Sequence, residues 1–289
     1  MFCELFGYSK QAYYKQKQAG KTFLLSGDVK TMVLDIRQQM PRLGTRKLYF
    51  ILKERFTKQG IKLGRDKLFT FLRNHHLLVE KKKSYTLTTD SRHWLKKYPN
   101  LTKQMVLKRP EQLWVADITY INTLNGFGYL HLITDAYSKQ IMGYELCDNM
   151  EATSTLKALQ MALKKRKYVN TSLIHHSDRG LQYCSKIYTQ LLIKNNIAIS
   201  MTENGDPYEN AVAERINGIL KDEFGLHERF DDLSQCQLQT KQSIDIYNQK
   251  RPHLSCQMLT PKQMHQQQTI KVKTWHKKTS NNHSIIGSS

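Results

Sequence analysis

Cysteine and long apolar runs are both scarce in this sequence of 289 residues. The five cysteines are scattered, odd in number and never arranged as a CxxC pair. This pattern argues against a disulfide framework and a cysteine-rich zinc module, and it favours a reducing cytosol. No apolar run approaches the ~20 residues that span a bilayer, and the first residues lack the pattern of a signal peptide. We therefore expect a cytoplasmic protein without a membrane partner.

Acidic residues are also few, with 24 Asp and Glu against 45 Lys and Arg, which gives a net charge of +21. Such a charge attracts polyanions, of which nucleic acid is the usual one, although solubility or adhesion to membrane surfaces are alternatives. The net charge is +17 over residues 1–108 (24 basic, 7 acidic), −1 over 109–230 (13 and 14) and +5 over 231–289 (8 and 3). A neutral middle between basic flanks suits a cation-binding core held by segments that bind DNA.

Three short amphipathic helices are expected between residues 26 and 78. Val29, Val33 and Ile36 recur at helical spacing in the first, a second ends near Gly60, and a basic third begins near Arg65. This arrangement predicts a helix-turn-helix DNA-binding domain; the alternative is a small helical bundle with a solvated basic face. The candidate DNA contacts are Arg42, Arg46, Lys47, Arg65, Lys67, Arg73, Lys81, Lys82 and Lys83.

From residue 111 the sequence becomes rich in β-branched and aromatic residues, which marks a second domain. Strands are expected over 113–121, 129–134, 139–146, 172–176 and 197–201, and helices over 150–167, 183–195 and 207–224. The order β-β-β-α-β-α-β-α predicts an α/β mixed sheet with helices packed on it. The expected division is a basic segment (1–25), helix-turn-helix-like domain (26–78), basic linker (79–108), catalytic core (109–230), helical extension (231–268) and disordered basic tail (269–289).

Three acidic residues stand out by their settings. Asp117 lies inside an apolar strand, where a carboxylate costs several kcal/mol unless a cation, an arginine or backbone N–H groups pair with it. Asp178 follows a strand and precedes Gly180, a position typical of sites in α/β folds but also of an ordinary Asx-turn. Glu214 projects about 160° away from Val212 on its expected helix, on a polar stripe that is either the edge of a site or simply a solvated face.

Four sequence blocks resemble the retroviral-integrase-like insertion-sequence transposases. They are WVADITY at 114–120, HSDRGLQY at 176–183, NGDPYENAVAE at 204–214 and YNQKRPH at 247–253. More narrowly, they are similar to the second-frame (OrfB-type) product of the bacterial group whose transposase is encoded in two overlapping frames. Residues 44–78 resemble the helix-turn-helix segment of that group, and the resemblance covers about residues 8–268.

This resemblance implies an RNase H-like mixed sheet with helices on both faces, preceded by a small all-α domain. Asp117, Asp178 and Glu214 would be the catalytic, metal-binding acids, holding two Mg²⁺ or Mn²⁺ ions for DNA strand cleavage and transfer. His176 and Asn210 would support them, although His176 could equally be a satisfied core histidine. The implied partners are element-end and target DNA, further copies of the chain and a first-frame (OrfA-type) protein, in a bacterial, nucleoid-associated setting.

Other interpretations remain open from the sequence. Another RNase H-like nuclease would share the acids, and a non-catalytic DNA-binding regulator or a decayed transposase would share the basic helices. A second-frame product is typically fused to the small first-frame protein, so the chain could be inactive alone.

Overall fold

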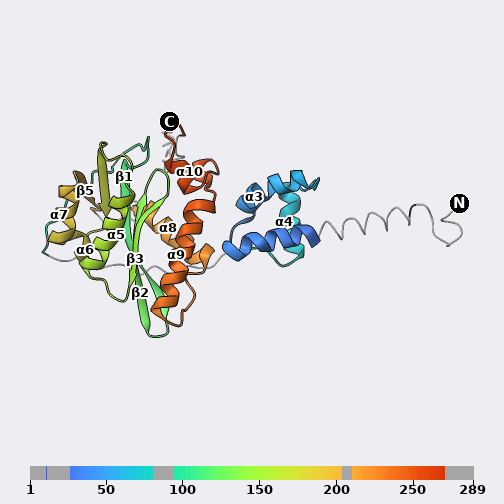
Figure 1. The fold of residues 1–289 in the computed structure, drawn as a ribbon, viewed down its shortest axis with the longest axis horizontal. Helices are drawn as coiled ribbons and strands as arrows, with labels where there is room; N and C mark the ends of the chain where they lie inside the picture. The colour runs from blue at the N-terminus through green and yellow to red at the C-terminus, as the bar shows by residue number, and fades with distance from the viewer. Residues whose placement is uncertain (1–10, 12–26, 81–93, 104, 204–209, 271–289) are drawn as a thin grey trace, which may run out of the picture.

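The computed structural model describes residue 11 and residues 27–80, 94–103, 105–203 and 210–270 (Figure 1). The expected basic segment, most of the expected tail, Lys81–83 and most of the third resemblance block therefore lie outside the described residues. Among the helices described, none has the length and apolar character needed to cross a membrane.

A mixed five-stranded sheet forms the centre of the protein, in the order β3-β2-β1-β4-β5. β1, β2 and β3 pair antiparallel through short connections, whereas β4 is parallel to both β1 and β5. The strands are β1 (Leu113–Thr123), β2 (Gly126–Asp135), β3 (Ile141–Cys147), β4 (Leu173–Ser177) and β5 (Ile197–Met201). This order and these directions confirm the predicted RNase H-like class.

Helices cover both faces of the sheet, and strand alternation decides which side chains meet them. Trp114 and Ala116 of β1 pack into the apolar cluster that contains Ala158 and Leu159, whereas Leu113 and Val115 pack against Ala213 on the opposite face. The helices are α5 (Ala152–Lys165), α6 (Leu181–Cys184) and α7 (Lys186–Lys194) on the first face, and α8 (Ala211–Phe224) and α9 (Leu233–Lys250) on the second. Odd-numbered β1 residues near Val115, Asp117 among them, therefore belong to the face that α8 covers.

Several boundaries differ from expectation, and three of these differences concern more than the exact end of an element. The helix expected over 183–195 is two helices, because Ser185 has extended backbone (φ −63°, ψ 146°) between α6 and α7. β2 begins at Gly126 rather than residue 129, since the antiparallel register with β1 continues to the Thr123–Gly126 pair. The described part of the helix expected from residue 207 begins at Ala211.

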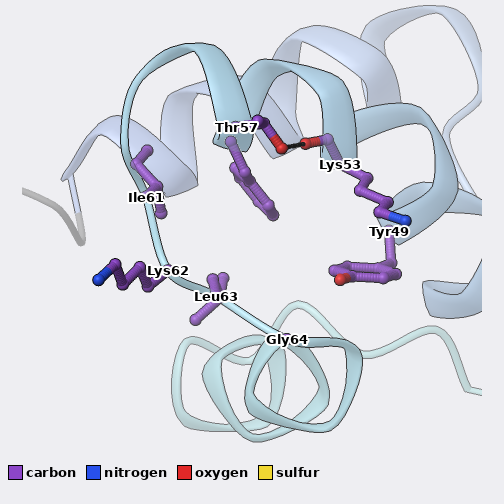
Figure 2. A pocket seen from close by; sticks show the side chains of 8 residues that line it. Tyr49, Lys53, Thr57, Ile61, Lys62, Leu63 and Gly64 are labelled. Atoms are coloured by element: carbon purple, nitrogen blue, oxygen red, sulfur yellow. Dashed lines mark hydrogen bonds between the residues drawn. The ribbon is translucent and has the colours of Figure 1, made fainter.

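Within residues 27–80, three helices precede the sheet, as predicted. They span residues 27–39, α3 (Thr45–Lys58) and α4 (Arg65–Asn74), and their apolar faces are buried together through Val33, Leu48 and Leu72. A pocket lies where α3 meets the turn into α4, lined by Tyr49, Lys53, Phe56, Thr57, Ile61, Lys62, Leu63 and Gly64 (Figure 2). We call residues 27–80 the helical segment.

Candidate active site

Asp117 lies on β1, and Asp178 directly follows β4, the parallel strand beside it. The register of β1 with β4 ends at the Val115–His176 pair, and each aspartate lies two residues beyond it. Because side chains alternate along a strand, Asp117 shares the face of Val115, the side of the sheet that α8 covers, and Asp178 at the neighbouring strand end is close enough for its charge to affect Asp117. The predicted strand-end position of Asp178 is observed, since β4 ends at Ser177.

Asp117 receives two hydrogen bonds and no salt bridge among the described residues. The backbone N–H of Ile118 donates to Oδ1 at 2.9 Å, and the side-chain amide of Asn217 donates to Oδ2 at 2.7 Å. Burial, followed by the charge of Asp178, raises the pKa of Asp117 to about 7, and Glu214 adds to this shift. A buried carboxylate was expected to pair with a cation, an arginine or backbone N–H groups. Among the described residues, Asp117 has one backbone N–H donor and one amide donor.

Lys221 on α8 is a positive charge that interacts with Asp117. Its Nζ lies 4.6 Å from the centroid of the Tyr120 ring. Burial lowers the pKa of Lys221, and the negative charge of Asp117 opposes that change. The lysine thus interacts electrostatically with Asp117 without forming an ion pair.

Glu214 lies in the first turn of α8 with an exposed side chain. Partial burial raises its pKa, and its charge is close enough to affect that of Asp117. Within the described part of the chain, however, no three His, Cys, Asp or Glu side chains are gathered closely enough to hold a metal ion. The three acids face one region without converging on a single point.

The groups around Asp117 suit a hard divalent cation. The carboxylate oxygens of Asp117 and the amide oxygens of Asn210 and Asn217 are of the kind that Mg²⁺ and Mn²⁺ prefer. The Oδ1 atoms of Asn210 and Asn217 are buried and have no hydrogen-bond partner among the described residues, which is rare for buried polar atoms. Excess negative charge beside these oxygen acceptors therefore suits the binding of a cation.

The polar stripe of α8 is not simply a solvated face. Asn210 and Asn217 are 8% and 6% exposed. The amide of Asn210 donates to the backbone carbonyl of Ala116 at 3.0 Å, so both asparagines fasten α8 to β1 on either side of Glu214. Asn217 was visible in the sequence only as a neighbour of Glu214 on the stripe, and its bond to Asp117 was not predicted.

The two histidines before Asp178 are buried in hydrogen-bonded settings. Nδ1 of His176 lies 2.8 Å from Oγ of Ser200 on β5, and Nε2 of His175 lies 2.9 Å from the hydroxyl of Tyr188. Burial lowers the pKa of His175 to about 3. His176 therefore fills a buried position two residues before Asp178. This position is compatible both with a role in supporting the acids and with that of a satisfied core histidine.

The candidate DNA contacts divide into engaged and exposed side chains. Lys47 forms an ion pair with Glu223 at 3.0 Å, and Arg42 donates to the carbonyl of Glu80 at 2.6 Å, so both have partners within the protein. Arg65 is exposed and pairs with the neighbouring Asp66. The remaining candidate DNA contacts on the helical segment, Arg46, Lys67 and Arg73, have exposed side chains.

Two models of the integrase core domain match the chain, one over residues 108–207 and one over residues 195–261. These ranges include β1 to β5, α8 and α9. The matched region therefore contains Asp117, Asp178 and Glu214.

Proteins of bacterial insertion sequences are similar to more than half of the chain. A 31 kDa protein of insertion element IS600 from Shigella sonnei is 34% identical over 90% of this chain and 95% of its own length. Transposase InsF of IS3A from Escherichia coli is 31% identical over 73% and 74%. The transposase of IS629 from Shigella sonnei is 39% identical over 57% and 55%.

Solved retroviral integrases also align, at lower identity. The catalytic core domain of HTLV-2 integrase is 18% identical, with a TM-score of 0.44, over 54% of this chain and 97% of its own. A chain of the simian T-cell lymphotropic virus intasome is 15% identical, with a TM-score of 0.48, over 86% and 79%. On the near-complete match to the IS600 protein and the integrase-core matches, the chain belongs to the integrase-core family of insertion-sequence transposases.

Proposed function

We propose that Asp117, Asp178 and Glu214 hold two Mg²⁺ or Mn²⁺ ions and form the catalytic centre for DNA strand cleavage and strand transfer. The observation that carries the proposal is the proximity of Asp117 on β1 to Asp178, directly after the adjacent parallel strand β4, and to Glu214 on α8, since both charges affect Asp117. Family membership supports divalent-metal chemistry, and the negative, oxygen-rich surroundings of Asp117 agree with it.

The chain's own groups have distinct tasks in this proposal. Asp117, Asp178 and Glu214 would hold the ions through their carboxylate oxygens. The hydrogen bond from Asn217 fixes the orientation of the Asp117 carboxylate. When bound, two such ions activate the attacking water or 3′-OH and stabilise the departing 3′ oxygen.

DNA is the proposed substrate and partner. The exposed side chains of Arg46, Lys67 and Arg73 supply phosphate contacts on the helical segment, and affinity should fall steeply with salt. The similarity to an intasome chain motivates a proposed assembly of several copies on DNA, and the two-frame resemblance motivates a first-frame protein as a further partner.

The test is a strand-transfer assay with labelled element-end duplexes and Mg²⁺ or Mn²⁺. Asp117→Asn should lower the rate by more than about 100-fold, beyond what loss of a supporting residue around a metal costs. Asp148→Asn, which changes an exposed aspartate beyond β3, is the matched control. Unchanged strand transfer by folded Asp117→Asn would refute the assignment.

A further inference from the structure

Glu223 is held by two cations that come from opposite ends of the chain. Its Oε1 lies 3.0 Å from Nζ of Lys47 on α3 and 2.7 Å from Nη2 of Arg251. Nε of Arg251 donates to Oε2 at 2.8 Å, which makes the arginine pair bidentate. Bidentate arginine pairs are among the strongest and most geometrically specific ion pairs, so one carboxylate joins three parts of the protein.

The C-terminal side of this contact is buried and rigidly supported. Arg251 is 1% exposed, and its Nη1 donates to Nε2 of His253 at 2.8 Å. The guanidinium lies 5.8 Å from the ring centroid of Tyr247, whose hydroxyl donates to the carbonyl of Lys139 at 2.8 Å. The YNQKRPH block (residues 247–253) had no role assigned from the sequence. It forms the binding site for the Glu223 carboxylate, which we call the Glu223 socket.

The same block also binds the first residue of the edge strand β3. β3 is an edge strand, and an edge leaves unpaired N–H and C=O groups. The side chain of Asn248 accepts from the N–H of Ile141 at 2.9 Å and donates to its carbonyl at 3.0 Å. The end of α9 is thus fixed to the sheet independently of Glu223.

The helical segment contacts this socket through three polar interactions. Besides the Lys47 pair, the N–H of Arg42 donates to the carbonyl of Glu223 at 3.2 Å, and Lys250 donates to Oε1 of Gln39 at 2.8 Å. Burial and then the charge of Arg251 lower the pKa of Lys47 to about 8, while Glu223 opposes that change. Burial alone would raise the pKa of Glu223, but Arg251 and Lys47 lower it.

Glu223 lies on the helix that bears Glu214, nine residues further on and therefore about 13–14 Å along its axis. In Figure 1 the helical segment (blue) lies beside the part of the core that contains α8 and α9. Because Lys47 on α3 is paired with Glu223 on α8, a shift of α3 would displace α8 as well.

We propose that Glu223 is a positioning residue: by binding Lys47 and Arg251 together, it fixes the helical segment in one register against the helix that carries Glu214. DNA held by the helical segment then reaches the acids in a defined position. The proposal rests on the proposed function for its consequence in catalysis, whereas the coupling itself is a property of the DNA-free protein.

The decisive variant is Lys47→Met, because it breaks the link to the helical segment and leaves the Arg251–Glu223 pair intact, so the core should still fold. Its matched control is Lys58→Met on the same helix, which removes an exposed ion pair with Glu54. Lys47→Arg keeps the charge and should restore the wild-type behaviour. Glu223→Gln tests the shared carboxylate itself.

Two measurements are needed. Hydrogen exchange without DNA should become about 2- to 30-fold faster in α3 and in the last turns of α8 for Lys47→Met, the range expected for residues that carry coupling. Exchange of the β1 and β2 amides should not change. In strand transfer, kcat should fall by a similar factor with KM for DNA within about twofold, since the helical segment still binds DNA.

The opposite result is equally clear. If Lys47→Met leaves exchange unchanged and instead raises KM for DNA, Lys47 contacts phosphate and the coupling proposal is wrong. If wild-type protein transfers no strand, the proposed function fails, while hydrogen exchange still decides whether Glu223 couples the two parts.

Discussion

The side-chain amide of Asn217 donates a 2.7 Å hydrogen bond to Oδ2 of Asp117, joining helix α8 to the central strand of the sheet. The other amide that bonds α8 to β1, from Asn210, ends on the carbonyl of Ala116 one residue earlier. Because Glu214 lies between the two asparagines, their bonds set how closely its helix approaches Asp117. The positions of two of the acids are therefore linked by side chains rather than by the backbone alone.

Asn217→Ala should reduce strand transfer by about 10- to 100-fold, the usual cost of losing a group that orients a metal ligand. The Asp117 carboxylate would lose its side-chain donor but keep the N–H of Ile118. The measurement is single-turnover strand transfer, with thermal unfolding to show that the fold survives. Asn149→Ala is the control, because this exposed asparagine also donates to an aspartate, Asp148. Equal rates for the two variants would rule out an orienting role.

Divalent metal should bind more tightly in the presence of element-end DNA than in its absence. Among the described residues the carboxylates do not form a closed metal cluster, so DNA oxygens would have to complete the coordination that Mg²⁺ demands. A ligand at about 100 times its Kd stabilises a protein by about 2.7 kcal/mol, which thermal unfolding with and without Mg²⁺ detects. Asp178→Asn should abolish this stabilisation, whereas Asp148→Asn should preserve it. The prediction fails if EDTA has no effect on the unfolding temperature of the wild-type complex with DNA.

Gly143→Ala should destabilise the protein strongly. A Cβ at this position of β3 would lie 2.0 Å from the carbonyl oxygen of Ala158 and 2.8 Å from the N–H nitrogen of Ala162. Both are backbone atoms of α5, so the helix would have to move away from the sheet, at a cost of about 1–3 kcal/mol or more. Urea unfolding measures this loss.

Gly218→Ala on α8 is the matched control for Gly143→Ala. Nothing lies within 4 Å of its added Cβ, and alanine is favoured over glycine inside a helix by up to about 1 kcal/mol. It should therefore stabilise the protein slightly. A similar loss of stability in both variants would show that close packing of α5 on β3 is not the cause.

Local pattern was enough to predict the sheet and most of its helices. Trp114, Val115 and Ile118 belong to a β-branched and aromatic run, a strong strand signal, and Val29, Val33 and Ile36 repeat at helical spacing. The break at Ser185 was missed because the apolar spacing continues across it, although its extended backbone ends α6. Boundaries of this kind depend on tertiary contacts that periodicity does not record.

The three candidate acids were proposed from their sequence settings and from the resemblance, whereas the contacts that surround them were not predicted. Glu223 and Arg251 are 28 positions apart, and Glu111 and His265 are 154 apart. No local spacing rule joins such residues, since their proximity depends on how α9 and α10 (Pro261–His265) return to the sheet. Lys47 shows the same limit, because its basic charge suggested a DNA contact while its closest partner is Glu223.

His265 should make the stability of the protein depend on pH above neutrality. It is 1% exposed, and its Nε2 lies 3.2 Å from Oε1 of Glu111, with Nδ1 3.8 Å from Oδ1 of Asp135. Burial alone would lower its pKa, but the bonds to Asp135 and Glu111 raise it to about 9. Arg166 is a further charge in this cluster, 3.8 Å from Glu111.

Because the folded pKa lies above the ordinary value of ~6.5 for an unfolded chain, protonated His265 stabilises the folded state. Its contribution, about 3 kcal/mol from the difference between the two pKa values, is fully present below pH ~6.5 and is lost as pH rises through about 9. Urea unfolding across this range should show wild-type stability falling relative to His265→Gln. The comparison isolates His265 because Lys47, whose pKa is about 8, is present in both proteins. His76→Gln, at an exposed position, should follow the wild-type curve, and parallel curves for wild type and His265→Gln would contradict a charged His265.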